Sequence, residues 1–470
     1  MTTTPETPET ATASPRMAVL GDRYRWTTIG VLLVISAVAF EGMGVGTAMP
    51  AIMGDIGSTS TYAWPFVAFI ASSVLATVLG GRWADRRGPG GPLITGVITF
   101  AIGLVVSGLS TSLPPMLAGR ALQGLGAGSL TVAIFVLVAR VYPVALRPAV
   151  FAWTASAWVL PSLLGPPAAA FVTERWGWHW VFLGIAPVAV LALVMVSSAL
   201  RRVERVPRPE TDSSGGWLLV LAALGAAGGV AALSWAGEGA TLAVVPVAVA
   251  AVVVLVPSLR TLLPRGTLRA RRGVASAVLC RGLIAGSFFA ANAYLPLMLT
   301  ELHAWPLERA GAMLIAGSLG WSAASAWQGG RPNLRRDMLL RIGAVLVALG
   351  LVVQIPIATG AISGWFALPG QAVAGLGMGL SMSSLAVLVM GHSGDGEVGF
   401  NTAAAQILDG LSTALLIGVG GTLIAVLTLS TGLPVLLGGL VVLVAVAALV
   451  APRTALVQQH ASVVAVTDAA

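Results

Sequence analysis

The segment GRALQGLGAG at residues 119–128 returns as GQAVAGLGMG at residues 370–379, an offset of 251 residues. A second segment, GGRWADRRG at 80–88, returns as GGRPNLRRD at 329–337, an offset of 249 residues. The two matches keep the same order and nearly the same spacing. Because self-similarity at a fixed spacing marks an internal repeat, the sequence predicts two copies of one structural unit.

The residues around these segments are far more apolar than those of a water-soluble protein. Hydrophobic residues make up 57% of the chain, charged residues 9%, and the mean hydropathy is +0.91. A soluble domain has roughly a quarter of its residues charged, whereas a membrane helix needs about 20 apolar residues. Windows of about 19 residues predict fourteen spans: 27–52, 62–82, 91–111, 114–139, 148–173, 179–200, 216–236, 241–262, 274–299, 307–328, 338–358, 364–390, 400–427 and 432–451.

The positive charge is distributed as in a membrane protein rather than a nucleic-acid binder. All 26 basic residues are Arg, and the net charge is +8. Most of them cluster in every second connection between spans, which the positive-inside rule assigns to the cytoplasm. We therefore expect a multi-pass protein of the inner (plasma) membrane with both termini cytoplasmic. The Arg residues of these connections and of the N-terminal segment are Arg16, Arg23, Arg25, Arg82, Arg86, Arg87, Arg140, Arg147, Arg201, Arg202, Arg205, Arg208, Arg260, Arg265, Arg269, Arg271, Arg272, Arg331, Arg335 and Arg336.

The repeat and the spans together predict an all-α polytopic protein. Spans 1–6 and 9–14 form two pseudo-symmetric six-helix bundles, and spans 7 and 8 are two extra linking helices. A single cysteine, Cys280, excludes an internal disulfide and a thiol-based metal site. The predicted organisation is a disordered cytoplasmic tail at 1–26, a bundle at 27–200, a linker at 201–215, two additional helices at 216–262, a bundle at 263–451 and a tail at 452–470.

Several motifs in these spans resemble those of the major facilitator superfamily. The loop after span 2 is similar to the family's loop signature, and span 4 is similar to its Arg-bearing helix motif. Span 1 carries Glu41 nine residues before Pro50, similar to the 14-spanning drug:proton antiporters, which usually have Asp at that position. Span 5 resembles their Gly-Pro motif, with Ala in place of the later glycines. The matching residues are Gly81, Asp85, Arg86 and Gly88; Arg120, Gln123, Gly124, Gly126 and Gly128; and Gly165 and Pro166.

Four ionisable residues inside the spans are the candidates for proton coupling or substrate binding: Glu41, Arg120, Arg281 and Asp409. Each costs about 2.5–3.5 kcal/mol at the centre of a membrane helix on insertion scales. Glu41 is an acid that a proton can neutralise, and the resemblance gives Arg120 a role in proton coupling. The alternatives are structural hydrogen bonds or ion pairs, a partly hydrated position for Asp409, and snorkelling for Arg281.

The remaining motif residues have structural alternatives beside their family roles. The resemblance implies that Gly81, Asp85, Arg86 and Gly88 form a gating loop that locks against the second half, although the arginines alone also fit a solvated loop. Gly124 and Gly128 predict close helix packing. Gly165 and Pro166 predict a kink in span 5, mobile or static. Four tryptophans fit interface belts or stacking on a substrate: Trp153, Trp158, Trp321 and Trp327.

We interpret the chain as a secondary active transporter that exports lipophilic or cationic small molecules in exchange for protons. Its expected partners are the substrate, protons and the lipid bilayer, as a monomer without nucleic acid, and its energy source is the proton gradient rather than a cofactor. This interpretation requires that a water-filled path reach Glu41 from alternate faces. Two other hypotheses are a dedicated exporter or importer of the same fold, and a non-transporting membrane sensor or scaffold. No catalytic constellation supports an enzyme.

Overall fold

The computed structural model describes residues 19–22, 24–200, 216–238, 244–329, 331, 334–394 and 397–456. The predicted linker 201–215 and most of both predicted tails lie outside these residues. Residues 19–22 and 24–26 are described, and there Val19 is fully buried and α2 begins at Arg25. The fold of the chain therefore begins before residue 27, the predicted start of the first bundle.

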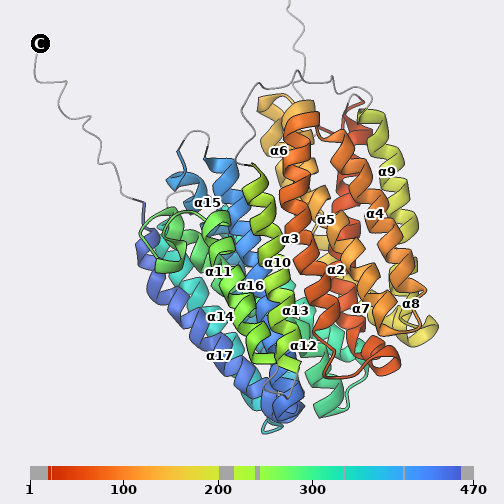
Figure 1. The fold of residues 1–470 in the computed structure, drawn as a ribbon, viewed down its shortest axis with the longest axis vertical. Coiled ribbons are helices and arrows are strands. Elements are labelled where there is room, and N and C mark those ends of the chain that lie inside the picture. The colour runs from red at the N-terminus through yellow and green to blue at the C-terminus, as the bar shows by residue number, and fades with distance from the viewer. Residues whose placement is uncertain are drawn as a thin grey trace, which may run out of the picture.

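The described residues form helices and no strands (Figure 1). The first half of the molecule comprises α2 (Arg25–Ile56), α3 (Trp64–Arg87), α4 (Gly90–Gly108), α5 (Leu113–Val141), α6 (Arg147–Ser156), α7 (Val159–Trp176), α8 (His179–Leu183) and α9 (Ala186–Leu200). The inserted helices are α10 (Gly216–Glu238) and α11 (Val245–Leu262). The second half comprises α12 (Val274–His303), α13 (Leu307–Gly329), α14 (Arg336–Ala358), α15 (Ala367–His392), α16 (Val398–Leu427) and α17 (Leu429–Val450).

Helices occupy all fourteen predicted spans, and twelve spans among the described residues are long and apolar enough to cross a membrane. The two spans that are less apolar, those of α7 and α13, pack against each other across the two halves. Their lower hydropathy is consistent with this contact, because helices buried between protein elements meet less lipid than outer helices do.

The fifth predicted span, 148–173, is not one helix, and the break between α6 and α7 has a proline as its cause. Pro161 has no N–H group and cannot donate to the carbonyl of Ala157 four residues earlier. Ser36 of α2 donates to that carbonyl instead, over 3.1 Å. By contrast, α7 continues through Pro166 and Pro167. The interruption thus lies before the Gly-Pro pair to which the sequence pattern assigned a kink.

The repeat appears in the structure as two matching helix contacts. A Cβ added to Gly124 or Gly128 of α5 would overlap the backbone of α3 at Phe69 and Ser73. A Cβ added to the repeat-related glycines of α15, Gly375 and Gly379, would overlap the backbone of α13 at Gly317 and Trp321. Each half therefore contains the same close packing of its second and fourth helices, which only glycine permits at these positions.

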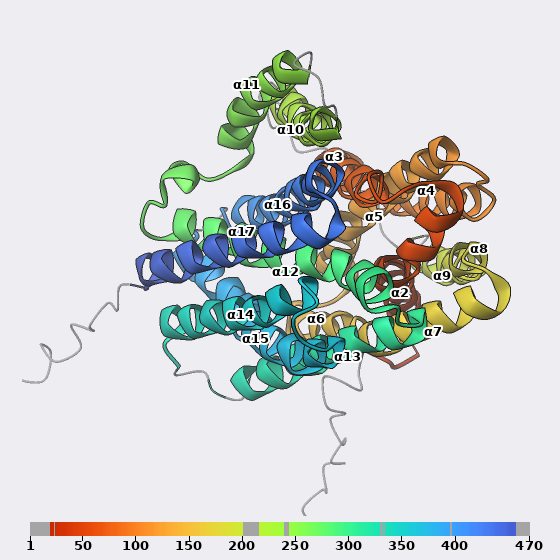
Figure 2. The same ribbon diagram turned by 90° about the horizontal axis from the view of Figure 1, so that it is seen from below.

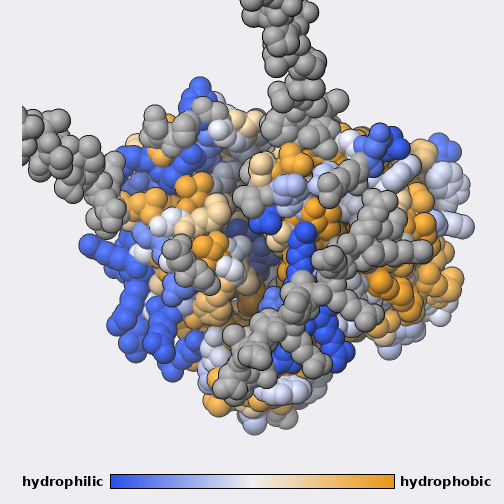
Figure 3. All heavy atoms as spheres, turned by 90° about the horizontal axis from the view of Figure 1, so that it is seen from above, coloured by the Kyte–Doolittle hydropathy of each residue, from blue (hydrophilic) through white to orange (hydrophobic). Residues whose placement is uncertain are grey.

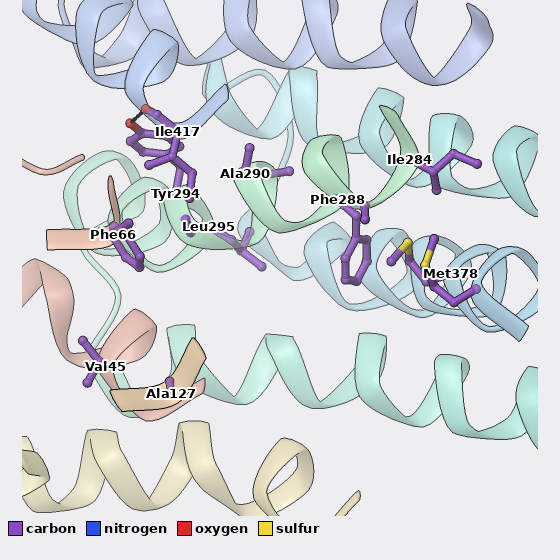
Figure 4. Packing of buried hydrophobic residues seen from close by; sticks show 14 of the residues in the cluster. Val45, Phe66, Ala127, Ile284, Phe288, Ala290, Tyr294, Leu295, Met378 and Ile417 are labelled. Carbon is purple, nitrogen blue, oxygen red and sulfur yellow. Dashed lines mark hydrogen bonds between the residues drawn. The ribbon is translucent and has the colours of Figure 1, made fainter. Parts of the chain in front are cut away.

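The two halves are joined at one end of the molecule, which we call the joined face; it carries residues 57–63, 174–178 and 303–307. The Tyr62 hydroxyl donates to the carbonyl of Ala293 over 2.8 Å, and its ring stacks on Tyr294. Tyr294 in turn donates to the carbonyl of Ile417 over 2.5 Å (Figure 4). Nearby, the Glu308 N–H donates to the Glu174 carboxylate over 3.1 Å.

The opposite end, which we call the Arg-rich face, carries residues 82–88 and 140–147. Viewed onto this face, the molecule is hollowed between its two halves, and hydrophilic side chains lie in the hollow (Figure 3). No hydrogen bond or ion pair within the described part of the chain joins the two halves at this end. The structure thus represents a state that is open on the Arg-rich face and closed on the joined face.

The inserted helix α10 lies across the seam between the halves, and α11 packs outside it (Figure 2). Its apolar side chains share one core with α3 of the first half and α16 of the second half, including Val74, Val230 and Leu411. At the Arg-rich end, the Arg82 guanidinium donates to the carbonyl of Gly216 and lies over the Trp217 ring. Span 7 therefore does more than link the halves, because α10 contacts both of them.

Candidate functional site

A buried ion pair lies inside the first half, where Glu41 of α2 meets Arg120 of α5. The Arg120 Nη1 group donates to Glu41 Oε1, and both side chains are almost completely enclosed. An unpaired charge in such surroundings would be strongly disfavoured. The two residues therefore depend on each other for their charged forms.

Arg120 is also held by partners that do not need Glu41. Its Nε group donates to the carbonyl of Pro65 over 3.2 Å, and Nη1 donates to Gln123 Oε1 over 2.6 Å. Its guanidinium carbon lies 4.5 Å from the centre of the Phe69 ring. Gln123 is fixed in turn, because its Nε2 donates to the carbonyl of Gly103. Arg120 is thus a positioned counter-charge with contacts that do not depend on the charge of Glu41.

Glu41 has no exposed surface in this conformation. Its second oxygen, Oε2, is buried without a hydrogen-bond partner among the described residues. The expected water-filled path to Glu41 is therefore absent from this state, because α2, α3 and α5 enclose the carboxyl group. A substrate in the hollow cannot touch Glu41 here, although the spare oxygen leaves a position that a proton can occupy.

The other two ionisable candidates form a second ion pair, in the second half. Arg281 Nη2 of α12 lies 3.3 Å from Asp409 Oδ2 of α16, and the side chains are 24% and 19% exposed. A Cβ added to the neighbouring Gly410 would lie 3.2 Å from Val74 of α3, so this part of α16 faces the first half. The structure brings the four candidates together two by two, with one pair in each half.

The candidate gating loop lies at the open Arg-rich face. Asp85 and Arg86 are exposed, and the attractive charge acting on Asp85 is that of Arg140 in the same half. Gly81, near the end of α3, is half-buried. Gly88 ends α3 with a φ of 87°, a left-handed conformation that favours glycine. Within the described residues, Asp85 has no ion pair with the second half, so the lock implied by the resemblance is not formed in this state.

The span-5 candidates lie where α7 crosses toward the second half. Gly165 approaches Met43 of α2, with 3.3 Å between an added Cβ and the Met43 Cβ. The backbone of Pro166 lies 3.3 Å from a Cβ added to Gly311 of α13. These small residues therefore allow α7 to contact one helix from each half.

Three uncharged residues of the second half were not predicted from the sequence: Asn292, Gln371 and Phe289. A fourth, Trp321, was predicted only to lie in an interface belt or to stack on a substrate. Gln371 of α15 donates from Nε2 to Asn292 Oδ1 of α12 over 2.7 Å. Phe289 and Trp321, whose ring centres lie 6.1 Å apart, are the half-buried aromatic side chains of the same region. The repeat contains a signal for Gln371, since it stands in GQAVAGLGMG where Arg120 stands in GRALQGLGAG.

The arrangement fits transport better than catalysis or metal binding. Two six-helix halves enclose a hollow that is open at one end. A buried ion pair lies inside the first half, and a partly exposed one lies in the second half near the seam. No group of three or more metal-ligating side chains occurs in the described ranges. The family model of the Major Facilitator Superfamily matches residues 31–416. This chain belongs to the major facilitator superfamily.

Relatives agree with this membership. An uncharacterized MFS-type transporter of Mycobacterium tuberculosis (strain ATCC 25618 / H37Rv) is 28% identical over 190 residues, 40% of this chain and 27% of that protein. Multidrug resistance protein 3 of Bacillus subtilis (strain 168) is 28% identical over 172 residues, 37% of this chain and 34% of that protein. The matched regions thus span about a quarter to a third of these relatives' own length.

A crystal structure of a POT family transporter in complex with 5-aminolevulinic acid has the same fold. It superposes with a TM-score of 0.69 at 15% identity and covers 91% of this chain and 96% of its own. At this identity the likeness concerns the fold alone. The family model and the apolar helices together show a multi-pass membrane protein of this superfamily.

Proposed function

We propose that this transporter exports apolar or cationic small molecules in exchange for protons, with Glu41 as the proton-carrying group. The observation that supports the proposal most is the Glu41–Arg120 pair, an acid and a base enclosed within a membrane-spanning bundle. Sequence similarity to a multidrug resistance protein favours lipophilic substrates. The distribution of Arg supports a cytoplasmic position for the Arg-rich face and for both termini, in a protein of the inner membrane.

The state described here is then the one that takes up cargo from the cytoplasm or the inner leaflet. The hollow opens to the Arg-rich face, and contacts such as Tyr62 to Ala293 close the joined face. Export requires that these contacts separate while residues 82–88 approach the second half. The repeat supports such a movement, because two similar halves can rock about a site between them.

Within this cycle, Arg120 is a fixed counter-charge and Glu41 the group that changes its protonation. When Glu41 is ionised, Arg120 balances it inside a dry bundle. When Glu41 takes a proton from the outer side, Arg120 keeps its contacts with Pro65, Gln123 and Phe69. Release of that proton to the cytoplasm requires water to reach Glu41 while the Arg-rich face is open, which needs a rearrangement of α2 and α5 from the conformation described here. Arg120 then favours the release, since a nearby positive charge stabilises the carboxylate.

Reconstitution into vesicles with an imposed pH gradient tests this proposal, with ethidium, Hoechst 33342 and rhodamine 6G as probes. The wild type is expected to accumulate at least one dye against its gradient when protons flow in the opposite direction. Glu41→Gln should abolish this accumulation, and Glu41→Asp should retain it because the acid is kept. Glu301→Gln, which changes an exposed acid at the joined face, is the matched control.

Each result has one interpretation. Proton-driven accumulation that survives Glu41→Gln would remove Glu41 from the mechanism. Accumulation in the direction of the proton flow would show an importer. Binding of the dyes without any flux in the wild type would favour the sensor or scaffold hypothesis over transport.

A further inference from the structure

The hydrogen-bonded side chains of Asn292 and Gln371, which we call the amide pair, are the counterpart in the second half of the Glu41–Arg120 ion pair in the first half. Arg120 and Gln371 are related by the repeat offset of 251 residues, and Glu41 and Asn292 are separated by the same offset. Both contacts join residues 79 positions apart, from the first helix to the fourth helix of each half. An interaction that is charged in one half is therefore neutral in the other.

The two pairs also differ in what they face. Glu41 and Arg120 are both enclosed, whereas Asn292 is half-buried beside an enclosed Gln371. The Asn292 side chain uses its oxygen to accept from Gln371, and its NH2 group has no partner among the described residues. Gln371 Oε1 likewise lacks a hydrogen-bond partner there. Each member of the amide pair thus has one hydrogen-bonding group, the Asn292 NH2 group and Gln371 Oε1, that is not used within the described residues.

The exposed part of Asn292 belongs to one face of α12. Arg281, Phe289 and Asn292 are half-buried, and steps of eight and three residues bring them to the same side of a helix. Most of the rest of α12 is buried against other helices of its half. Arg281 pairs with Asp409, and the next residue, Gly410, approaches Val74 of the first half, so this face of α12 reaches the seam between the halves at Arg281.

Aromatic side chains of α12 and α13 lie beside this face of α12. Trp321 of α13 lies 6.1 Å from Phe289 and 6.0 Å from Phe288, measured between ring centres. Phe288 points toward Met378 and is part of the core (Figure 4), whereas Phe289 and Trp321 keep accessible surface. A molecule in contact with these two rings and with Asn292 would find an apolar, flat surface and one hydrogen-bond donor.

We propose that Asn292, Phe289 and Trp321 form the substrate-contacting surface, and that the two halves have different roles in transport. The first half carries the proton on Glu41 inside a sealed bundle, and the second half binds cargo with a pair that cannot titrate. The cargo is a ring-containing, largely apolar molecule with a hydrogen-bond acceptor, neutral or cationic. This inference rests on the proposed export function and assigns the side chains that select its substrate.

The test separates binding from coupling. Equilibrium binding of ethidium, Hoechst 33342 and rhodamine 6G to the purified full chain is measured beside their proton-driven flux. Trp321→Ala and Asn292→Leu should each weaken binding about tenfold, the loss expected when a stacked ring or a buried hydrogen-bond donor is removed. Their flux should return to that of the wild type at saturating dye. Glu41→Gln should bind the dyes as the wild type does and lose only the proton-driven flux.

Trp327→Ala is the matched control, since Trp327 lies on the same helix, is 46% exposed and contacts Arg331 instead. The assignment of different roles to the two halves is overturned if Glu41→Gln weakens dye binding as much as Trp321→Ala does. The assignment of the surface is overturned if Trp321→Ala and Asn292→Leu bind like Trp327→Ala, or if the wild type binds none of the dyes. Wild-type binding without flux would contradict the export proposal and leave the surface supported.

Discussion

Replacing Arg120 by Gln is the most informative perturbation of the ion pair. The change removes the only charge that contacts Glu41 in the described structure and leaves a carboxylate with no exposed surface. Breaking a buried pair by deleting one partner destabilises proteins by about 3–5 kcal/mol, because the remaining charge is uncompensated. We expect Arg120→Gln to lower the free energy of unfolding by that amount.

The second half of the protein shows how to repair the defect. Asn292 and Gln371 occupy the repeat-related places and satisfy each other without charge. The double variant Glu41→Asn with Arg120→Gln reproduces this pair in the first half. It should therefore recover most of the lost stability, with a coupling free energy of about 2–3 kcal/mol in a double-mutant cycle, while proton-driven transport stays abolished.

The assay uses the single cysteine of the chain. Cys280 is fully buried, so a thiol-reactive fluorophore labels it only after unfolding. Labelling during titration with dodecyl sulfate in mixed micelles gives the free energy of unfolding for each variant. The reasoning is refuted if Arg120→Gln is as stable as the wild type, or if the double variant is no more stable than Arg120→Gln alone.

Three further changes test other parts of the structure. Gly128→Val should prevent close packing of α5 on α3 and destabilise the protein by about 3 kcal/mol or more. The control, Gly42→Ala, should be tolerated because an added Cβ there meets nothing within 4 Å. The dodecyl sulfate titration measures the free energy of unfolding of both variants. A disulfide between Ala63→Cys and Gly421→Cys should hold the joined face closed and stop dye flux until it is reduced. An added Cβ at Gly421 lies 2.8 Å from the Ala63 Cβ, and a separation of the two helices by about 1 Å brings the pair to disulfide distance. Asp409→Asn should cost only about 1 kcal/mol by the same titration, since its ion pair is partly exposed, and a loss as large as that of Arg120→Gln would contradict this ranking.

Much of the fold follows from hydropathy and from the repeat. The spans, the two similar halves and the close packing at Gly124 and Gly128 depend on local composition and on residue size, which a sequence displays directly. The break before α7 was not predicted, because a window of apolar residues runs across it. It depends on Pro161 and on the Ser36 hydroxyl, which comes from a helix more than a hundred residues earlier.

The candidate site was only partly accessible from the sequence. Ionisable residues in apolar spans are conspicuous, so Glu41, Arg120, Arg281 and Asp409 could be named. Which of them pair, and that Glu41 is sealed from the hollow, depends on how helices turn toward one another. Asn292 and Gln371 are uncharged and escaped notice for that reason, although the repeat places Gln371 opposite Arg120.

The central claim is that Glu41, dry in the state described here, meets water when the joined face opens. Modification of Glu41 by dicyclohexylcarbodiimide, followed by mass spectrometry of its peptide, tests the claim in the Ala63→Cys/Gly421→Cys variant. The reduced protein, free to cycle, should be modified at Glu41, and the cross-linked protein should be protected. Equal modification of Glu41 in both forms would contradict the account.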